Sequence, residues 1–136
     1  MLNDTQLATL QAALDRIIPP DDAPGAWEAG AGEYILLQLR GDLADMLGTY
    51  RAGLDSLDYE ALAASGRPFA ELGPDAQDAL LARVERGEAQ VPWTTDSQQF
   101  FHTLCEHAAE GFYSDPGNGG NRDGVAWRMI GFEVRG

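Results

Sequence analysis

Apolar residues along most of this chain recur at steps of three and four, and this spacing restricts the possible folds more than any other feature of the sequence. The first run consists of Leu7, Leu10, Leu14, Ile17 and Ile18. Asn3 or Asp4 can cap its start, and Pro19-Pro20 must end it. No segment alternates with period two for long enough to predict a strand. The first run therefore predicts a helix, and the chain as a whole predicts a helical protein.

Four more helical runs follow the first one. They comprise a second helix marked by Trp27 and by Tyr34 to Leu39, a third from Leu43 to Leu57 that Leu62 can extend, a fourth from Pro74 to Val84, and a fifth that ends near Phe112. Gly41 and Asp42 leave open whether the second and third runs are separate or form one kinked helix. Pro74 suits the first turn of its helix, and Thr95 or Asp96 can cap the fifth.

The number and length of these runs predict the fold class. With 136 residues, of which 44% are hydrophobic, the chain can bury one core. We therefore expect an all-α fold, with about five helices in a small bundle and a long irregular C-terminal tail. The domain assignment is a single helical domain over residues 1–136, of which 113–136 form the tail. Phe69 and Leu72 are expected to pack beneath the start of the fourth helix.

The charge balance excludes several classes of partner. The chain has 22 acidic and 9 basic residues, a net charge of -13, and every basic residue is an arginine. Such a polyanion is repelled by nucleic acid and by anionic lipid surfaces. No window approaches the roughly 20 apolar residues of a membrane-spanning helix. Neither nucleic-acid binding nor direct membrane insertion is expected.

The residues that could support catalysis are few. His102 and His107 lie five positions apart, which places them roughly 140° apart around a regular helix and prevents joint metal binding. Cys105 shares a face with His102, but it also falls in an expected apolar stripe. That stripe consists of Phe101, Cys105, Ala108 and Phe112, with Phe100 and Leu104 widening it. Cys105 is therefore interpreted as a small buried hydrophobe, and Glu106 and Glu110 as solvated side chains.

The glycine-rich run from Gly117 to Gly124 resembles cofactor loops only in part. It follows a helix and contains no lysine, so it fits neither a phosphate-binding loop nor a dinucleotide fingerprint. A calcium loop that starts at Asp115 would place Ala126 where the bidentate glutamate belongs. One alternative stays open, namely a small stand-alone metal-binding protein or hydrolase that uses the Asp115 to Asp123 loop with His102 or His107.

The tail is also rich in aromatic residues and arginine, which most often dominate the energy of protein interfaces. The candidate partner-binding residues are Phe112, Tyr113, Arg122, Asp123, Trp127, Arg128 and Phe132. Two roles are open for Trp127 and Phe132, because they can cover the core of this chain or contact another protein. The aspartates, asparagines and glycines between them are expected to shape the loop.

Several short motifs resemble one known family. In the first half they are Ile17-Ile18-Pro19-Pro20-Asp21, Pro24-Gly25-Ala26 and Glu28-Ala29-Gly30; in the middle they are Pro68-Phe69-Ala70-Glu71-Leu72 and Gln77-Asp78-Ala79-Leu80-Leu81; near the end they are Gly111-Phe112-Tyr113-Ser114-Asp115-Pro116, Gly119-Gly120-Asn121-Arg122-Asp123-Gly124, Trp127 and Ile130-Gly131-Phe132. Spread along nearly the whole chain, they resemble the small-subunit family of gluconate 2-dehydrogenase, also called subunit 3 or the gamma subunit.

The resemblance implies a non-catalytic accessory subunit that stabilises a large flavoprotein. That partner is of the glucose-methanol-choline type, carries the FAD and oxidises a sugar or sugar acid, with a cytochrome subunit as a further candidate partner. No cofactor is expected in this chain. Family members often carry a twin-arginine signal that exports the partner with them, and residues 1–5 show no such signal. A periplasmic location is expected if a signal has been removed, and a cytoplasmic one otherwise.

Overall fold

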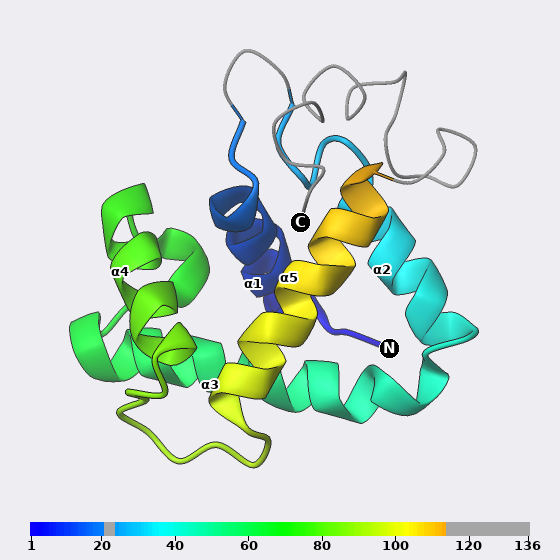
Figure 1. Cartoon of the computed structure of the whole chain (residues 1–136). Helices are drawn as coiled ribbons and strands as arrows, with labels where there is room; N and C mark the ends of the chain where they lie inside the picture. Colours follow the sequence, from blue (N-terminus) through cyan, green and yellow to red (C-terminus); the bar gives the residue numbers. More distant parts are fainter. Residues whose placement is uncertain (21–23, 114–136) are drawn as a thin grey trace.

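A computed structural model describes residues 1–20 and 24–113, and every regular element in these residues is helical. The elements in chain order are α1 (Asp4–Ile17), α2 (Ala31–Arg40), the 3₁₀ helix η1 (Ala44–Met46), α3 (Leu47–Ser65), the 3₁₀ helix η2 (Phe69–Glu71), α4 (Pro74–Glu85) and α5 (Ser97–Tyr113). Figure 1 shows α5 crossing in front of α1, with α2 and α4 on opposite sides and α3 across the base. The predicted all-α fold class is confirmed.

The sequence signals at the start of α1 act as capping groups. The Asn3 carboxamide accepts a hydrogen bond from the Gln6 N–H at 2.7 Å, and the Gln6 side chain accepts one from the Asn3 N–H at 2.9 Å. This reciprocal capping box satisfies N–H groups that have no partner inside the helix. Asn3, rather than Asp4, is therefore the cap. The helix ends at Ile17, before the two prolines.

The second helix starts later than Trp27, the first residue that marked it in the sequence. Residues 26–30 form a turn, and α2 begins at Ala31 after Gly30, whose φ of 102° is left-handed. Gly30 tolerates this conformation because it has no Cβ atom. At the other end, Gly41 and the 3₁₀ turn η1 separate α2 from α3. The question of one kinked helix or two is resolved in favour of two.

The remaining helices follow their predicted end signals. α3 continues through Leu62 to Ser65 and ends at Gly66, which has a φ of 76°. Pro74 is in the first turn of α4, and the Asp96 side chain accepts a hydrogen bond from the Gln99 N–H at 2.9 Å at the start of α5. Of the two caps proposed for α5, Asp96 is the one that makes this bond.

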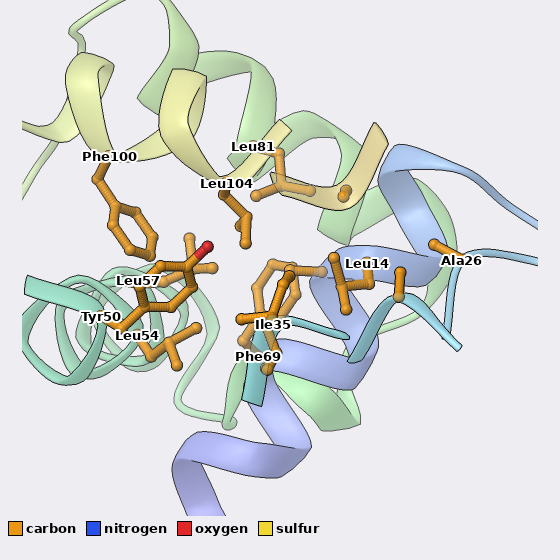
Figure 2. Close-up of a cluster of buried hydrophobic side chains, with 14 of the residues drawn as sticks. Leu14, Ala26, Ile35, Tyr50, Leu54, Leu57, Phe69, Leu81, Phe100 and Leu104 are labelled. Atoms are coloured by element: carbon orange, nitrogen blue, oxygen red, sulfur yellow. The ribbon is translucent and has the colours of Figure 1, made fainter. Parts of the chain in front are cut away.

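The core lies where the five α-helices meet, and η2 adds to it from one side (Figure 2). Phe69 of η2 is fully buried, and Leu72 is partly buried against the same cluster. We expected both beneath the start of α4, but η2 packs mainly against α1 and α3, and α4 reaches it through the hydrogen bond from Gln77 to the Phe69 carbonyl. Tyr50 and Phe100 meet edge to face across α3 and α5, with ring centroids 5.8 Å apart. Gly53 of α3 lies directly against the Phe100 ring, so its lack of a side chain lets α5 approach α3 closely.

The buried face of α5 differs from the predicted stripe. Its buried residues are Phe100, Thr103, Leu104, His107, Ala108, Gly111 and Phe112. Phe101 and Cys105 are only half-buried, so Cys105 lies at the edge of the buried face and not at its centre as the stripe predicted. The helix is rotated because Phe100 packs against Gly53 and Tyr50, which a pattern read from α5 alone cannot reveal.

Candidate functional site

Segments that lie far apart in the sequence meet at one end of the bundle. There the last turn of α1, residues 24–31 and the last turn of α5 come together (Figure 1). We call this set, with Tyr34 of α2, the bundle end. Several of the motifs quoted above meet here, whereas Pro68 to Leu72 packs elsewhere, against α1 and α3. The bundle end is therefore the candidate site.

Residues 24–31 are fastened to α1 and to themselves by backbone hydrogen bonds. The Ala26 N–H donates to the Ile18 carbonyl at 2.9 Å, and the Ala31 N–H donates to the Ala26 carbonyl at 2.9 Å. Gly25 lies so close to α1 that a Cβ atom there would be 2.8 Å from the Ile18 carbonyl oxygen. The glycine of the Pro24-Gly25-Ala26 motif is thus required because backbone approaches backbone closely at this position.

Trp27 links this turn to both helices. The backbone N–H of Trp27 donates to the Asp15 carboxylate at 3.4 Å, and the indole ring lies against Gly32 at the start of α2. Burial raises the pKa of Asp15, the hydrogen bond from Trp27 opposes this, and the neighbouring charge of Glu28 adds to the rise. The turn therefore places an aromatic side chain and an acidic pair next to each other at the bundle end.

α2 and α5 form the most extensive helix pair, and Gly111 permits their closest approach. A Cβ atom at Gly111 would lie 2.9 Å from the Ala31 Cα and 3.0 Å from the Tyr34 ring. The Tyr34 hydroxyl donates to the Glu110 carboxylate at 3.2 Å. Burial and the charge of Glu110 raise the pKa of Tyr34, which keeps this hydroxyl protonated as a donor. The last turn of α5 is held firmly by α2.

This packing makes a testable prediction for Gly111. In Gly111→Ala, the new methyl group forces α2 and α5 apart, and overpacking of this kind costs about 1–3 kcal/mol, which exceeds the gain of about 1 kcal/mol in helix propensity. Urea unfolding followed by circular dichroism should show a net loss of stability. Gly48→Ala is the matched control, since a Cβ atom at Gly48 in α3 meets nothing within 4 Å. Equal stabilisation of both variants would contradict the close packing at Gly111.

Two of the seven predicted partner-binding residues lie in the described part of the chain. Phe112 is fully buried in the core, and its ring meets the half-buried ring of Tyr113 edge to face, with centroids 5.2 Å apart. Phe112 thus anchors the end of α5, and Tyr113 is the last residue of the helix rather than the first of the tail. The other five are Arg122, Asp123, Trp127, Arg128 and Phe132, which lie outside the described residues, as does the Asp115 to Asp123 loop of the metal-binding alternative.

The candidate catalytic residues on α5 point in different directions. Cys105 and His102 line one open pocket, and burial raises the pKa of the Cys105 thiol to about 11. The exposed His102 lies 3.5 Å from Glu106. His107 faces the interior, where its Nδ1 atom is 2.7 Å from the Tyr50 hydroxyl. Among the described residues, no three histidine, cysteine or acidic side chains are placed to hold a metal ion.

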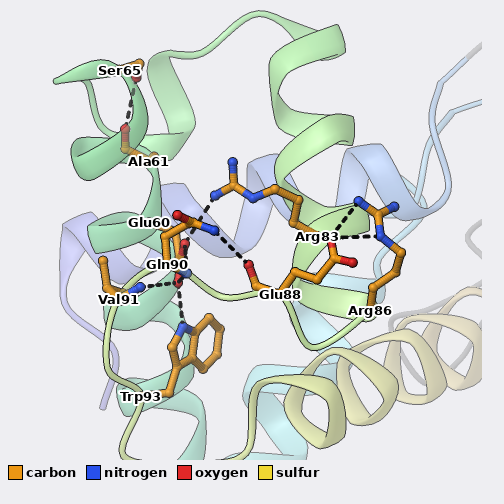
Figure 3. Close-up of polar contacts among 9 residues, drawn as sticks. All are labelled: Glu60, Ala61, Ser65, Arg83, Arg86, Glu88, Gln90, Val91 and Trp93. Atoms are coloured by element: carbon orange, nitrogen blue, oxygen red, sulfur yellow. Dashed lines mark hydrogen bonds and ion pairs between the residues drawn. The ribbon is translucent and has the colours of Figure 1, made fainter.

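One polar centre was not predicted from the sequence, namely the fully buried carboxylate of Glu60 in α3 (Figure 3). It accepts hydrogen bonds from Gln90, Val91 and Trp93 and pairs with Arg83 of α4. The only signal in the sequence was a charged residue between the apolar Leu57 and Ala61 in a helix, and such a residue is normally exposed. Its partners become visible only in three dimensions.

Comparison with known proteins gave one match. A family model described as gluconate 2-dehydrogenase subunit 3 matches residues 4–134. Searches of curated proteins and of solved structures found no match. No helix in the described part of the chain is long and apolar enough to cross a membrane.

Proposed function

Because the chain belongs to the gluconate 2-dehydrogenase subunit 3 family, we propose that it is a non-catalytic accessory subunit that binds and stabilises a large FAD-dependent dehydrogenase. The observation that carries this proposal is the extent of the family match, which covers residues 4–134 of the 136. The partner holds the flavin and oxidises a sugar or a sugar acid. Joint export with that partner and the presence of a cytochrome subunit stay predictions of the resemblance.

The geometry of α5 supports a non-catalytic role for this chain. A cysteine nucleophile acts as its thiolate, and the raised pKa of Cys105, at about 11, keeps this thiol protonated at neutral pH. His107 is turned toward Tyr50 and away from Cys105's pocket. The exposed His102 side chain lines the same open pocket as Cys105 and lies 3.5 Å from Glu106. A thiol that stays protonated is a poor nucleophile, and this supports a non-catalytic role.

The bundle end is the surface we propose for contact with the dehydrogenase. The helix pair of α2 and α5 makes it rigid, and a rigid surface loses little conformational entropy when a partner binds. Tyr113 ends α5 at this surface, and the chain continues from there into the segment that contains Arg122 and Trp127. Tyrosine, arginine and tryptophan are the residue types that most often provide binding energy.

Co-expression with the dehydrogenase tests the proposal directly. We expect the large subunit to be soluble, flavin-loaded and active when this chain is present, and to lose solubility and flavin when it is omitted. The readouts are the amount of soluble large subunit, its flavin absorbance per protein and its dye-linked dehydrogenase activity. A large subunit that is equally soluble, flavin-loaded and active alone would refute the accessory role.

Single substitutions locate the contact within that complex. Trp127→Ala should weaken binding by about 2 kcal/mol, or roughly thirtyfold in Kd, measured by calorimetry or surface plasmon resonance. Tyr59→Ala is the control, because Tyr59 is an exposed aromatic residue of α3, 57% accessible, that does not belong to the bundle end. Thermal unfolding of the isolated Trp127→Ala chain separates binding of the partner from packing within this chain. An unchanged melting temperature would show that Trp127 does not cover the core of this chain.

A further inference from the structure

The connector between α4 and α5, residues 86–96, converges on one buried carboxylate (Figure 3). Glu60 Oε2 accepts hydrogen bonds from the Gln90 N–H at 2.9 Å, the Val91 N–H at 3.1 Å and the Trp93 indole N–H at 2.9 Å. Glu60 Oε1 lies 3.3 Å from an Arg83 guanidinium nitrogen. Donors from two elements thus surround a carboxylate that comes from a third.

This arrangement has the composition of an anion-binding site. Successive backbone N–H groups that point to one spot form a concave site for negative charge. An indole N–H and a guanidinium add donors that have no acceptor capacity of their own. In the described residues the donors of this site belong to Arg83 and the connector, while the anion is supplied by Glu60.

The same contacts explain why the carboxylate stays ionised. Burial alone would raise the pKa of Glu60, but the hydrogen bonds from Trp93, Gln90 and Val91 and the charge of Arg83 outweigh it and lower the pKa below 4.5. The other charged groups nearby are engaged elsewhere. Glu88 of the connector pairs with Arg86, and Asp58 of α3 accepts the Phe69 N–H.

The middle of the connector depends on this contact. Within the described residues, every hydrogen bond from the segment 90–93 to a helix is accepted by Glu60. Trp93 in turn packs beside Phe100 of α5, with ring centroids 6.0 Å apart. If the carboxylate loses its charge, its oxygens become weaker acceptors for these donors, and Trp93 is then held mainly by its apolar packing against the core.

We propose that Glu60 is a latch, and that residues 90–93 with Arg83 form a carboxylate-binding site that holds the connector closed while the Glu60 anion occupies it. Loss of the anion, by protonation or by substitution, frees the connector and the Trp93 side chain while the helices stay folded. The latch is a conformational device of this chain alone, and it does not depend on the identity of the partner.

The direction of the pH dependence follows from the pKa of Glu60. A group whose pKa is lower in the closed form stabilises that form fully above its ordinary value, here 4.5, and this stabilisation is lost as the pH falls through the lowered value. The latch is therefore closed at neutral pH and opens in acid. It opens before general acid unfolding if the helices do not depend on the same proton.

An NMR titration of the full ¹⁵N-labelled chain from pH 7 to pH 3 tests the latch. The Trp93 indole N–H and the Gln90 and Val91 amide N–H resonances should move together, with one midpoint below pH 4.5, while the amides of α1 and α5 keep their dispersion. Glu88→Gln is the control and should leave this midpoint unchanged, because Glu88 pairs with Arg86. Separate midpoints, or loss of all helical signals at the same pH, would overturn the proposal.

Chemical rescue provides an independent arm. Glu60→Ala retains the Cβ atom and removes a CH₂–COO⁻ group. An acetate ion has the same size as this group and carries the same charge. At pH 7 the melting temperature of this variant should rise with acetate concentration and reach a plateau, whereas chloride at equal ionic strength and the wild-type chain should show no such saturation. A variant that folds without any saturable response to acetate would refute the site. A variant that does not fold leaves the decision to the wild-type titration.

Discussion

Glu60→Ala should lower the free energy of unfolding by about 3–5 kcal/mol at pH 7, the range found when one partner of a buried ion pair is removed. The wild-type carboxylate is fully buried and accepts bonds from the Trp93 indole and from backbone N–H groups. Its removal leaves the Trp93 and backbone donors without their acceptor and deprives Arg83, whose side chain is 30% exposed, of its counter-charge. Urea unfolding followed by circular dichroism, in the absence of acetate, measures the change.

The comparison with an exposed glutamate makes this result specific. Glu88 lies in the same connector and pairs with Arg86 at 3.1 Å, but its side chain is 55% exposed. Surface pairs of this kind contribute little, so Glu88→Ala should change the stability by no more than about 0.5 kcal/mol. If both variants lose the same stability, the buried contacts of Glu60 do not stabilise the fold as described.

Phe69→Ala is the second substitution with a large expected effect, a loss of about 3–5 kcal/mol. The Phe69 side chain is fully buried between α1 and α3, although it belongs to a single 3₁₀ turn. Its backbone is held from both sides, by the Asp58 carboxylate at 2.8 Å and by the Gln77 side chain at 2.9 Å. The surrounding structure therefore cannot collapse into the cavity, which places the loss at the upper end of this range.

Leu62→Ala controls for the loss of a large apolar side chain. Leu62 is 41% exposed on α3, and removal of its side chain leaves no cavity. Its effect on the free energy of unfolding should stay within about 0.5 kcal/mol. Calorimetric melting of the two variants under identical conditions provides the comparison. A Phe69→Ala chain with the same melting temperature as the wild type would show that η2 is not part of the core.

The helices could be predicted from the sequence because their signals are local. The step of three and four between apolar residues, the cap at Asn3 and the proline at position 74 each act within a few residues of their own helix. Where a boundary depended on distant groups, the prediction was less accurate. α2 begins at Ala31 rather than Trp27, because the turn before it is fastened to α1 through the Ile18 carbonyl.

The candidate site was predictable only in part. The sequence pointed to the last turn of α5 and to several short motifs, but it could not show that Gly111 lies against Ala31 or that residues 24–31 close the same end. It also placed Cys105 in the core, whereas the packing of Phe100 against Gly53 rotates that face of α5 toward solvent. Five of the predicted contact residues lie outside the described residues and stay predictions.

The sequence by itself determined the helical class, the order of the helices and an acidic, lysine-free composition from which we expect no binding to nucleic acid. These properties depend on periodicity, local capping and composition. Only the tertiary structure decided which residues meet at the bundle end and that Glu60 is buried. The physical reason is that helix rotation and charge burial depend on contacts between residues far apart in the chain, such as the 33 positions that separate Glu60 from Trp93.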